Sequence, residues 1–267
     1  MKLETQVKNT LKKIKLSRKD KILVALSGGK DSAVTAYLLH KFEYNIQAIH
    51  IDLKMGGYSK KCLKAVQDLC SQLNIKLHIY DIKKEMGSSM CYIRSSIQQE
   101  KAIKNCAICG VIKKWILNKE ARKLKFDKIA TGHHLDDESQ TFLLNVLKGS
   151  PQLSSNTGPI TRNISDKKFI PRIKPLFYVL EEDIKKYSKQ KKLPVVYDKC
   201  PCAIDSYRIQ IKGFMKLLSR KEKENIMKNS EKVISKLQKK NTTINYCELC
   251  GEPSRRSQCK KCRLLRV

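Results

Sequence analysis

The sequence predicts an α/β protein built on a doubly wound parallel sheet, with a small zinc-binding module at its C-terminal end. The sheet is predicted because short apolar runs alternate with longer helical patterns along the first half of the chain. The module is predicted because four cysteines stand in two CxxC pairs near the end. A chain of 267 residues is long enough for one sizeable core and such an appendage.

The chain begins with a predicted basic amphipathic helix over residues 1–20, where Val7, Leu11 and Ile14 recur at three- and four-residue spacing. The apolar runs predict buried strands at residues 21–26, 46–51, 76–80 and 128–131. Helices are expected between and after these strands, over residues 33–42, 60–73, 111–124 and 138–147.

The second half of the chain departs from this alternation. Residues 149–175 contain four prolines with Gly, Ser and Asn, which predicts a loop. A helix over residues 181–191, a last strand over residues 193–196 and a strongly basic helical region over residues 207–239 follow. We therefore divide the chain into a basic N-terminal helix, a sheet domain, a basic helical region and a zinc module, at residues 1–20, 21–205, 206–245 and 246–263.

The charge balance favours a polyanionic partner. The chain has 56 Lys and Arg against 25 Asp and Glu, a formal net charge of +31, and such a surplus raises the local concentration of nucleic acids. Its composition is that of a globular protein, and no apolar stretch is long enough to cross a membrane. The N-terminus is polar and lacks the apolar core of a signal peptide, so we expect a cytoplasmic protein.

The segment Ser27–Ser32, with the sequence SGGKDS, stands between an apolar strand and a helix. Its two glycines let the backbone approach a ligand, and the following helix N-terminus offers free N–H groups to an anion. Ser27 and Ser32 add hydroxyl groups and Lys30 adds a positive charge. The segment matches neither the Walker loop nor GxGxxG. A bare Gly-Gly turn is the alternative, but the whole pattern predicts a nucleotide phosphate site and an ATP-consuming enzyme.

A second block, TGHHLDDE at residues 131–138, also stands at a strand-to-helix turn. Gly132 allows a close approach, and the carboxylates can hold Mg²⁺ or accept a proton. An acidic helix cap is the structural alternative. Because an ATP loop is predicted in the same sheet, we favour a chemical role.

SGGKDS resembles the PP-loop of ATP pyrophosphatases, the adenine nucleotide alpha hydrolase-like fold. The resemblance implies a five-stranded parallel sheet, cleavage of ATP to AMP and pyrophosphate, and Mg²⁺ on the triphosphate. Ligands in such sheets lie at the carboxyl ends of the strands, which puts the adenine near His50 and Ile51, with Asp52 beside them. The residues expected to contact ATP are Ala25, Ser27, Gly28, Gly29, Lys30, Asp31, Ser32, Ile51, Gly132 and His133.

The chain has 11 cysteines, and in a reducing compartment such clustered cysteines indicate a metal site. Cys106 and Cys109 open a predicted helix, and Cys200 and Cys202 lie far downstream. The first pair with one of the second would give three thiolates and leave a metal one open position. The scattered residues Cys62, Cys70 and Cys91 are expected to be small buried apolar residues.

Together with the two ATP motifs, CAICG and CPCA resemble the TtcA/TtuA family of tRNA 2-thiolation enzymes over residues 20–210 and the tail. The resemblance implies a [4Fe–4S] cluster on Cys106, Cys109 and Cys200, whose fourth iron binds sulfur. ATP would adenylate a nucleobase oxygen, and iron-bound sulfide would displace AMP. Lys113 and Asp137 match the catalytic basic and acidic positions of TtuA-type enzymes.

Alternatives to the cluster are a persulfide relay between Cys109 and Cys200, and then a closed zinc site. The chain also departs from TtuA-like sequences in three places. Cys202 replaces an aromatic residue, which leaves the choice between Cys200 and Cys202 open. The segment after Ile51 lacks the usual Glu-Gly-Ile, and residues 1–20 lack the cysteines of an N-terminal zinc ribbon.

The tail has the spacing of a tetrahedral thiolate site for Zn²⁺, and its ligands are Cys247, Cys250, Cys259 and Cys262. Arg and Lys residues surround these cysteines. They can offset the negative charge of the four thiolates or contact RNA phosphates.

The sequence thus predicts a tRNA sulfurtransferase that thiolates C2 of a uridine, at either the wobble position or the T-loop. The alternatives are cytidine 2-thiolation, a lysidine-type ligase and an RNA adaptor without turnover; the three cysteines argue against the ligase. We expect tRNA as the substrate, a homodimer, and either a ubiquitin-like thiocarboxylate carrier or free sulfide as the sulfur donor.

Overall fold

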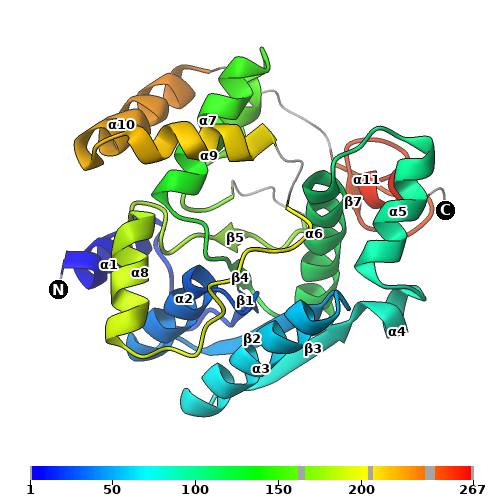
Figure 1. Ribbon diagram of the computed structural model, residues 1–267, viewed down its shortest axis with the longest axis horizontal. Helices are drawn as coiled ribbons and strands as arrows, with labels where there is room; N and C mark the ends of the chain where they lie inside the picture. Colours follow the sequence, from blue (N-terminus) through cyan, green and yellow to red (C-terminus); the bar gives the residue numbers. More distant parts are fainter. Residues whose placement is uncertain (1, 162–165, 204–206, 238–243, 266–267) are drawn as a thin grey trace.

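The computed structural model describes residues 2–161, 166–203, 207–237 and 244–265 (Figure 1). Five strands form one sheet in the order β3-β2-β1-β4-β5, and every neighbouring pair is parallel. The strands are β1 (Ile22–Leu26), β2 (Ile46–Asp52), β3 (Leu77–Asp81), β4 (Lys128–Ala130) and β5 (Arg172–Ile173). The predicted α/β class and parallel sheet are therefore confirmed.

Alternate residues of β1 face opposite sides of the sheet, as strand geometry requires. Ile22, Val24 and Leu26 pack with one set of helices in the main core, whereas Leu23 packs with α6 on the other face. The helices on the first face are α1 (Lys2–Lys13), α2 (Lys30–Lys41), α3 (Gly57–Gln72) and α8 (Glu181–Gln190), and α6 spans Asn105–Lys123. Buried Leu3, Val7 and Leu11 attach α1 to this core.

A second layer of helices stands beyond the carboxyl end of β4 (Figure 1). Two small apolar clusters join its members, one around Leu144, Ile211 and Met215 and one around Leu135 and Met227. The joined helices are α7 (Leu135–Leu147), α9 (Tyr207–Leu217) and α10 (Arg220–Lys236), and the 3₁₀ helix η1 (Pro151–Asn156) lies against α7 and α10. Basic helices α9 and α10 thus cover the carboxyl edge of the sheet. Residues 238–239 of the predicted helical region lie outside the described residues.

The fifth strand corrects the sequence analysis. Residues 193–196 form no strand, and Val196 donates one hydrogen bond, at 2.8 Å, to the carbonyl of Gly28. The edge strand is β5, inside the region predicted as a loop. It directly follows Pro171, and proline is tolerated at such edges because it needs to donate no ladder hydrogen bond.

Two helices lie where the sequence analysis predicts none, α4 (Ile82–Met86) and α5 (Met90–Glu100). The Ser89 side chain caps α5, and Met90, Ile93 and Ile97 pack against α6. The C-terminal module consists of the hairpin β6 (Asn245–Tyr246) and β7 (Pro253–Ser254) followed by α11 (Lys260–Leu265). Among the described residues, no helix is long and apolar enough to cross a bilayer.

Candidate active site

Two glycine turns meet at the carboxyl edge of the sheet. Gly28 has a φ of +86°, and a Cβ there would lie 2.8 Å from the Cα of Cys62 on α3. Gly132 follows β4, and a Cβ there would lie 2.7 Å from the backbone of Asp31 and Ser32. Neither position has room for a side chain, so the loop after β1 packs directly against α3 and the turn after β4 packs directly against the first turn of α2.

The loop after β1 is held by its own serines. The Ser32 hydroxyl donates to the Gly29 carbonyl at 3.0 Å and accepts from the Ser27 amide at 3.2 Å. Ser32 is buried, so its hydroxyl shapes the loop. Helix α2 then begins at Lys30 with no side-chain cap on its N-terminus. Its first N–H groups are left for an anion, as the phosphate prediction requires.

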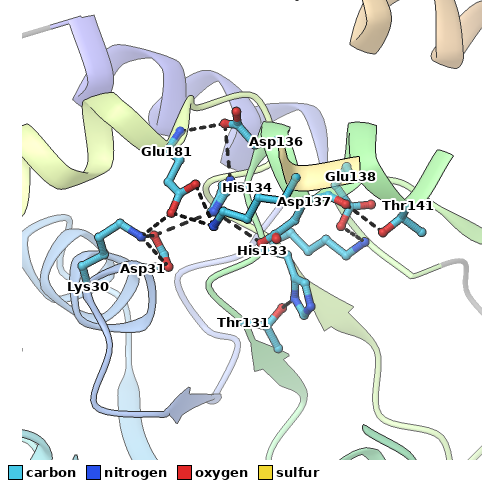
Figure 2. A network of polar contacts seen from close by, with 12 residues as sticks. Lys30, Asp31, Thr131, His133, His134, Asp136, Asp137, Glu138, Thr141 and Glu181 are labelled. Atoms are coloured by element: carbon cyan, nitrogen blue, oxygen red, sulfur yellow. Dashed lines mark hydrogen bonds and ion pairs between the residues drawn. The ribbon is translucent and has the colours of Figure 1, made fainter. Parts of the chain in front are cut away.

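Lys30 is held by two carboxylates (Figure 2). Its Nζ lies 3.1 Å from an oxygen of Asp31 and 2.9 Å from an oxygen of Glu181, the first residue of α8. Glu181 also pairs with Lys212 of α9 at 3.1 Å. Burial opposes ionisation of Glu181, but Lys30 and Lys212 outweigh it and lower the pKa of this carboxyl to about 2. An internal anion therefore holds the lysine that is expected to bind phosphate.

The acidic residues of the second block surround a buried histidine (Figure 2). The ring nitrogens of His134 lie 3.4 Å from Asp137 and 3.6 Å from Asp136. Burial lowers the pKa of His134, but Asp137, Asp136 and Asp31 outweigh this effect and raise it. Asp136 also accepts a hydrogen bond from the Glu181 amide at 2.8 Å. The two turns and α8 thus share one charge network.

Asp137 differs from its acidic neighbours in exposure. Asp136 and Glu138 are buried, and Glu138 pairs with Lys174 at 2.8 Å. The Asp137 side chain is 31% exposed, with Arg208 of α9 at 3.8 Å. This position fits the predicted role of Asp137 in proton transfer or Mg²⁺ binding. Neighbouring His133 is exposed, and its Nδ1 lies 2.9 Å from the Thr131 hydroxyl.

The predicted adenine edge lies at the ends of β1 and β2. Ala25 and Ile51 are half-buried and pack together with the α6 side of the core. His50 is buried and its Nδ1 lies 2.9 Å from the Leu26 carbonyl. Asp52 is buried against Lys54 at 2.9 Å. Ile51 therefore fits an adenine contact better than either polar neighbour.

The structure brings the separated cysteine motifs to one place. Cys106 and Cys109 lie in the first turn of α6, where Cys106 is exposed and Cys109 half-buried. The Asn105 side chain donates to the Cys202 carbonyl at 3.2 Å, which fixes the segment of Cys200 and Cys202 against this turn. The two cysteine motifs, which are far apart in the sequence, therefore lie next to each other in the fold.

Cys200 and Cys202 face different neighbours. Burial raises the pKa of the Cys62 thiol, nearby Cys200 raises it further, and Lys113 opposes them. Cys200 and Lys113 therefore both lie within electrostatic range of the Cys62 thiol. Cys202 instead accepts a hydrogen bond from Arg94 at 2.8 Å.

Arg94 connects a second group of thiols. Besides Cys202, it donates to Cys91 at 3.3 Å, and Cys109 helps to raise the pKa of its guanidinium against the effect of burial. Cys91 is exposed, so the prediction that it is buried is wrong, whereas Cys62 and Cys70 are buried as expected. The Arg94 guanidinium adds a positive charge beside these thiols, which suits an anionic metal centre.

These residues fit an iron–sulfur cluster by their chemistry. Three cysteines are available from two elements, and Lys113 and Arg94 offset negative charge. A cluster binds each thiolate through a different iron, so its ligands are spread wider than those of a single ion. Among the described residues, the tail cysteines form the one group whose metal-binding atoms all lie within 4.8 Å of one another. A closed single-ion site on Cys106, Cys109 and Cys200 is therefore disfavoured.

The four tail cysteines form a compact candidate metal site. Backbone amides point at the sulfurs: Cys259 N–H donates to Cys247 Sγ at 3.2 Å. Burial raises the pKa of Cys247, but hydrogen bonds from backbone amides outweigh it and lower the pKa to about 6. The buried carboxylate of Glu252 attaches this module to α6 through Arg122 and Asn118.

The sequence analysis missed Glu181 and Arg94. Glu181 lies 151 positions from its partner Lys30, so no local motif could reveal the pair. Its position at a helix start near the carboxyl edge was the one available signal. Arg94 lies on α5, which was not predicted. Because the chain has 56 Lys and Arg residues, one more positive charge gave no signal.

Known proteins resemble this chain over nearly its whole length. A family model described as the PP-loop domain matches residues 1–212. The tRNA-5-methyluridine(54) 2-sulfurtransferase of Pyrococcus horikoshii is 35% identical over 266 residues, covering 97% of this chain and 83% of that protein. The protein of the same name in Thermotoga maritima is 31% identical, covering 98% and 86%.

One solved structure has the same architecture throughout. It is that of the U34-tRNA thiolase NcsA from Methanococcus maripaludis with its [4Fe-4S] cluster, which matches with a TM-score of 0.80 at 26% identity. The match covers 98% of this chain and 86% of that one.

Proposed function

Because this chain belongs to the PP-loop domain family and to the group of tRNA 2-thiolation enzymes within it, we propose that it uses ATP to replace the C2 oxygen of a tRNA uridine with sulfur. The proximity of the nucleotide loop to the cysteine segment is the observation that carries this proposal. Gly28 of the nucleotide loop packs on Cys62 and accepts a hydrogen bond at 2.8 Å from Val196, in the segment that leads to Cys200. A base activated at the first site is therefore within reach of sulfur chemistry at the second.

The nucleotide site supplies positioning and charge. The first N–H groups of α2 and the Lys30 ammonium bind the triphosphate, which displaces Glu181 from Lys30 toward Lys212. Mg²⁺ bound near Asp137 would neutralise further charge. The uridine C2 oxygen then attacks the α-phosphorus, the bond to the bridging oxygen breaks, and pyrophosphate leaves with that electron pair.

The second half-reaction exchanges oxygen for sulfur. Sulfur forms a bond to C2, and the C2–O bond breaks as AMP leaves with the oxygen. Cys106, Cys109 and Cys200 would hold a [4Fe–4S] cluster, which supplies an iron with an open position for sulfur when bound. Lys113 stabilises the developing negative charge, and Asp137 moves protons at the base. Cys200 is the third ligand that the family resemblance implies, and Cys202, two residues further on, accepts a hydrogen bond from Arg94.

The tail and the partners complete the proposal. Cys247, Cys250, Cys259 and Cys262 hold a structural Zn²⁺ and so fix the module that faces the RNA. Cys106 is exposed, so a ubiquitin-like thiocarboxylate carrier or free sulfide can deliver sulfur from solvent. We retain a cytoplasmic homodimer as a prediction.

The test of this function is Cys106→Ala in anaerobically prepared protein. Removal of one ligand should abolish the visible absorption of the cluster and lower thiolation at least about 1,000-fold, because one half-reaction is lost. ATP binding should be unchanged, since Cys106 is not part of the nucleotide loop. Mass spectrometry of digested tRNA measures thiolation, and Cys70→Ala, which removes a thiol of the main core outside both cysteine motifs, is the matched control.

Normal thiolation by Cys106→Ala would contradict the cluster assignment. Mapping the thiolated nucleoside within the tRNA, in cells with and without the gene, decides between the wobble and T-loop uridines. A lysidine-type product, or 2-thiocytidine, would replace the proposed reaction by one of its alternatives.

A further inference from the structure

A cavity of about 770 Å³ lies between α6 and the C-terminal module. One wall comes from α6, from Cys106 to Asn118, and the opposite wall comes from the module, from Glu252 to Arg263. Thr161, Phe169 and Arg172 close a third side. The volume is in the range of sites that enclose small organic ligands, and Cys106 places one end of the cavity at the proposed cluster site.

The cavity is strongly basic. Among the described residues that line it, one has a carboxylate, Glu252, which already pairs with Arg122 behind the wall. The cations that line it are Lys114, Arg172, Arg255, Arg256, Lys260, Lys261 and Arg263. Burial lowers the pKa of Lys114, and repulsion from Arg172, Lys260 and other cations lowers it further. Positive charges held this close without acidic partners favour an external anion.

Two lining residues have donors without partners. The Trp115 Nε1 and the Arg172 Nε are buried and find no hydrogen-bond partner in the described part of the chain. Burying a donor unpaired costs about 1–3 kcal/mol, so these two residues lie in surroundings that are short of hydrogen-bond acceptors. The Trp115 ring also has two ammonium groups over it, those of Lys261 at 4.6 Å and Lys119 at 5.0 Å from the centroid. Ring, guanidinium and ammonium groups in one cavity match the chemistry of a nucleotide.

We propose that this cavity binds one nucleotide of the substrate RNA next to the target uridine, with its phosphate on Lys114, Arg172 and Arg256 and its base beside Trp115. The proposal rests on the proposed function, because it takes tRNA as the substrate. It goes further because it assigns a nucleotide site to the cavity, one wall of which is formed by α6 from Cys106 onward. The C-terminal module and α6 thereby hold this nucleotide from opposite sides.

An RNA fits the cavity better than the tail of a protein donor does. Seven cations from three separate segments face one space, whereas a single C-terminal carboxylate or thiocarboxylate would use one or two of them. An RNA strand carries a charge on every nucleotide and offers bases for stacking. The protein donor is therefore the competing outcome of the test below.

The experiment uses the sole tryptophan of the chain, Trp115, as a reporter inside the cavity. An unmodified tRNA transcript is titrated into the full-length holoprotein, and Trp115 fluorescence is recorded with correction for RNA absorbance. Binding should change the fluorescence to a saturating level, and ATP alone should leave it unchanged. Affinity is measured in parallel by anisotropy of labelled tRNA at several salt concentrations.

The variants are Lys114→Met on one wall and Arg256→Ala on the other. Each should weaken tRNA binding about tenfold and lower the salt slope by about one, as expected for loss of one phosphate contact. Lys123→Met removes an exposed charge from the same helix outside the cavity and should change binding less than twofold. Unchanged ATP affinity and metal content show that each variant is folded.

Three results would overturn the site. If the wild type thiolates tRNA but both variants bind it normally, the cavity is not an RNA site and the proposed function stands. If the two variants fail to thiolate tRNA only when a ubiquitin-like thiocarboxylate replaces free sulfide as the donor, the cavity binds the protein donor. If the wild type neither binds nor thiolates tRNA, the site and the proposed function both fail.

Discussion

The nucleotide edge and the basic cavity place similar cations in opposite situations. At the edge, Lys30 and Lys212 share the carboxylate of Glu181. In the cavity, Lys114 and Arg172 stand among other cations, and the single carboxylate of the lining pairs with Arg122 behind the wall. The comparison indicates that the edge is charge-balanced before its ligand binds, whereas the cavity depends on its ligand for balance. Each region can be disturbed separately.

The largest effect is expected from Gly132→Ala, which breaks the nucleotide edge. The added Cβ would lie 2.7 Å from the backbone of Asp31 and Ser32, where no flexible side chain can move away. Overpacking of this kind costs about 1–3 kcal/mol, and displacement of the loop should weaken ATP binding at least about 100-fold by calorimetry. The cavity should still bind tRNA.

The control for this change is Gly57→Ala, at the first residue of α3. A Cβ there meets nothing within 4 Å, so ATP affinity should not change. If Gly132→Ala binds ATP as the wild type does, the two turns do not form one site.

A smaller effect is expected from Glu252→Ala, which loosens the cavity wall. The buried Glu252 accepts hydrogen bonds from Arg122 and Asn118, both at 3.0 Å. Losing one partner of a buried pair costs about 3–5 kcal/mol, and we expect about 2–3 kcal/mol because Arg122 reaches solvent. Thermal unfolding measures this loss, and tRNA affinity should fall about tenfold while ATP affinity stays constant.

Glu248→Ala removes the same charge from an exposed position in the same module and serves as the control. Equal tRNA affinities for the two variants would show that the attachment of the module to α6 does not shape the RNA site.

The smallest effect, and one of opposite sign, is expected from Glu181→Gln. The amide no longer competes with phosphate for Lys30, so ATP should bind about three- to tenfold more tightly. Glu182→Gln, at an exposed neighbour that pairs with Arg220, should leave ATP affinity unchanged. Weaker ATP binding by Glu181→Gln would show that Glu181 helps the nucleotide rather than competing with it.

The same carboxylate predicts a pH effect on stability. Its pKa is lowered from 4.5 to about 2 in the folded protein, so its contribution is complete above pH 4.5 and is lost as the pH falls toward 2. Denaturation at stepwise lower pH should therefore show a steeper loss for the wild type than for Glu181→Gln. Parallel curves would mean that the pairs with Lys30 and Lys212 add nothing to folding.

The parts of the site that could be predicted are those that are local in the chain. Gly28 and Gly132 stand in short strand–turn–helix segments, and the tail cysteines have their spacing within one module. Glu181 could not be predicted, because the topology of the sheet alone brings it to Lys30. Strand β5 is two residues long, Arg172 and Ile173, too short for any periodicity. Helix α5, in contrast, had readable signals in Ser89 and in the spacing of its apolar residues.

Cys62 is linked to both halves of the proposed reaction, and this limits how such sequences can diverge. Its Cα would lie 2.8 Å from a Cβ at position 28, while its thiol is within electrostatic range of Cys200 and Lys113. A larger residue at position 62 would push on the nucleotide loop, and a charged one would change the electrostatic field at the cysteine segment. Descendants that keep this backbone can therefore replace Cys62 only by another small, uncharged residue, or must change both sites together.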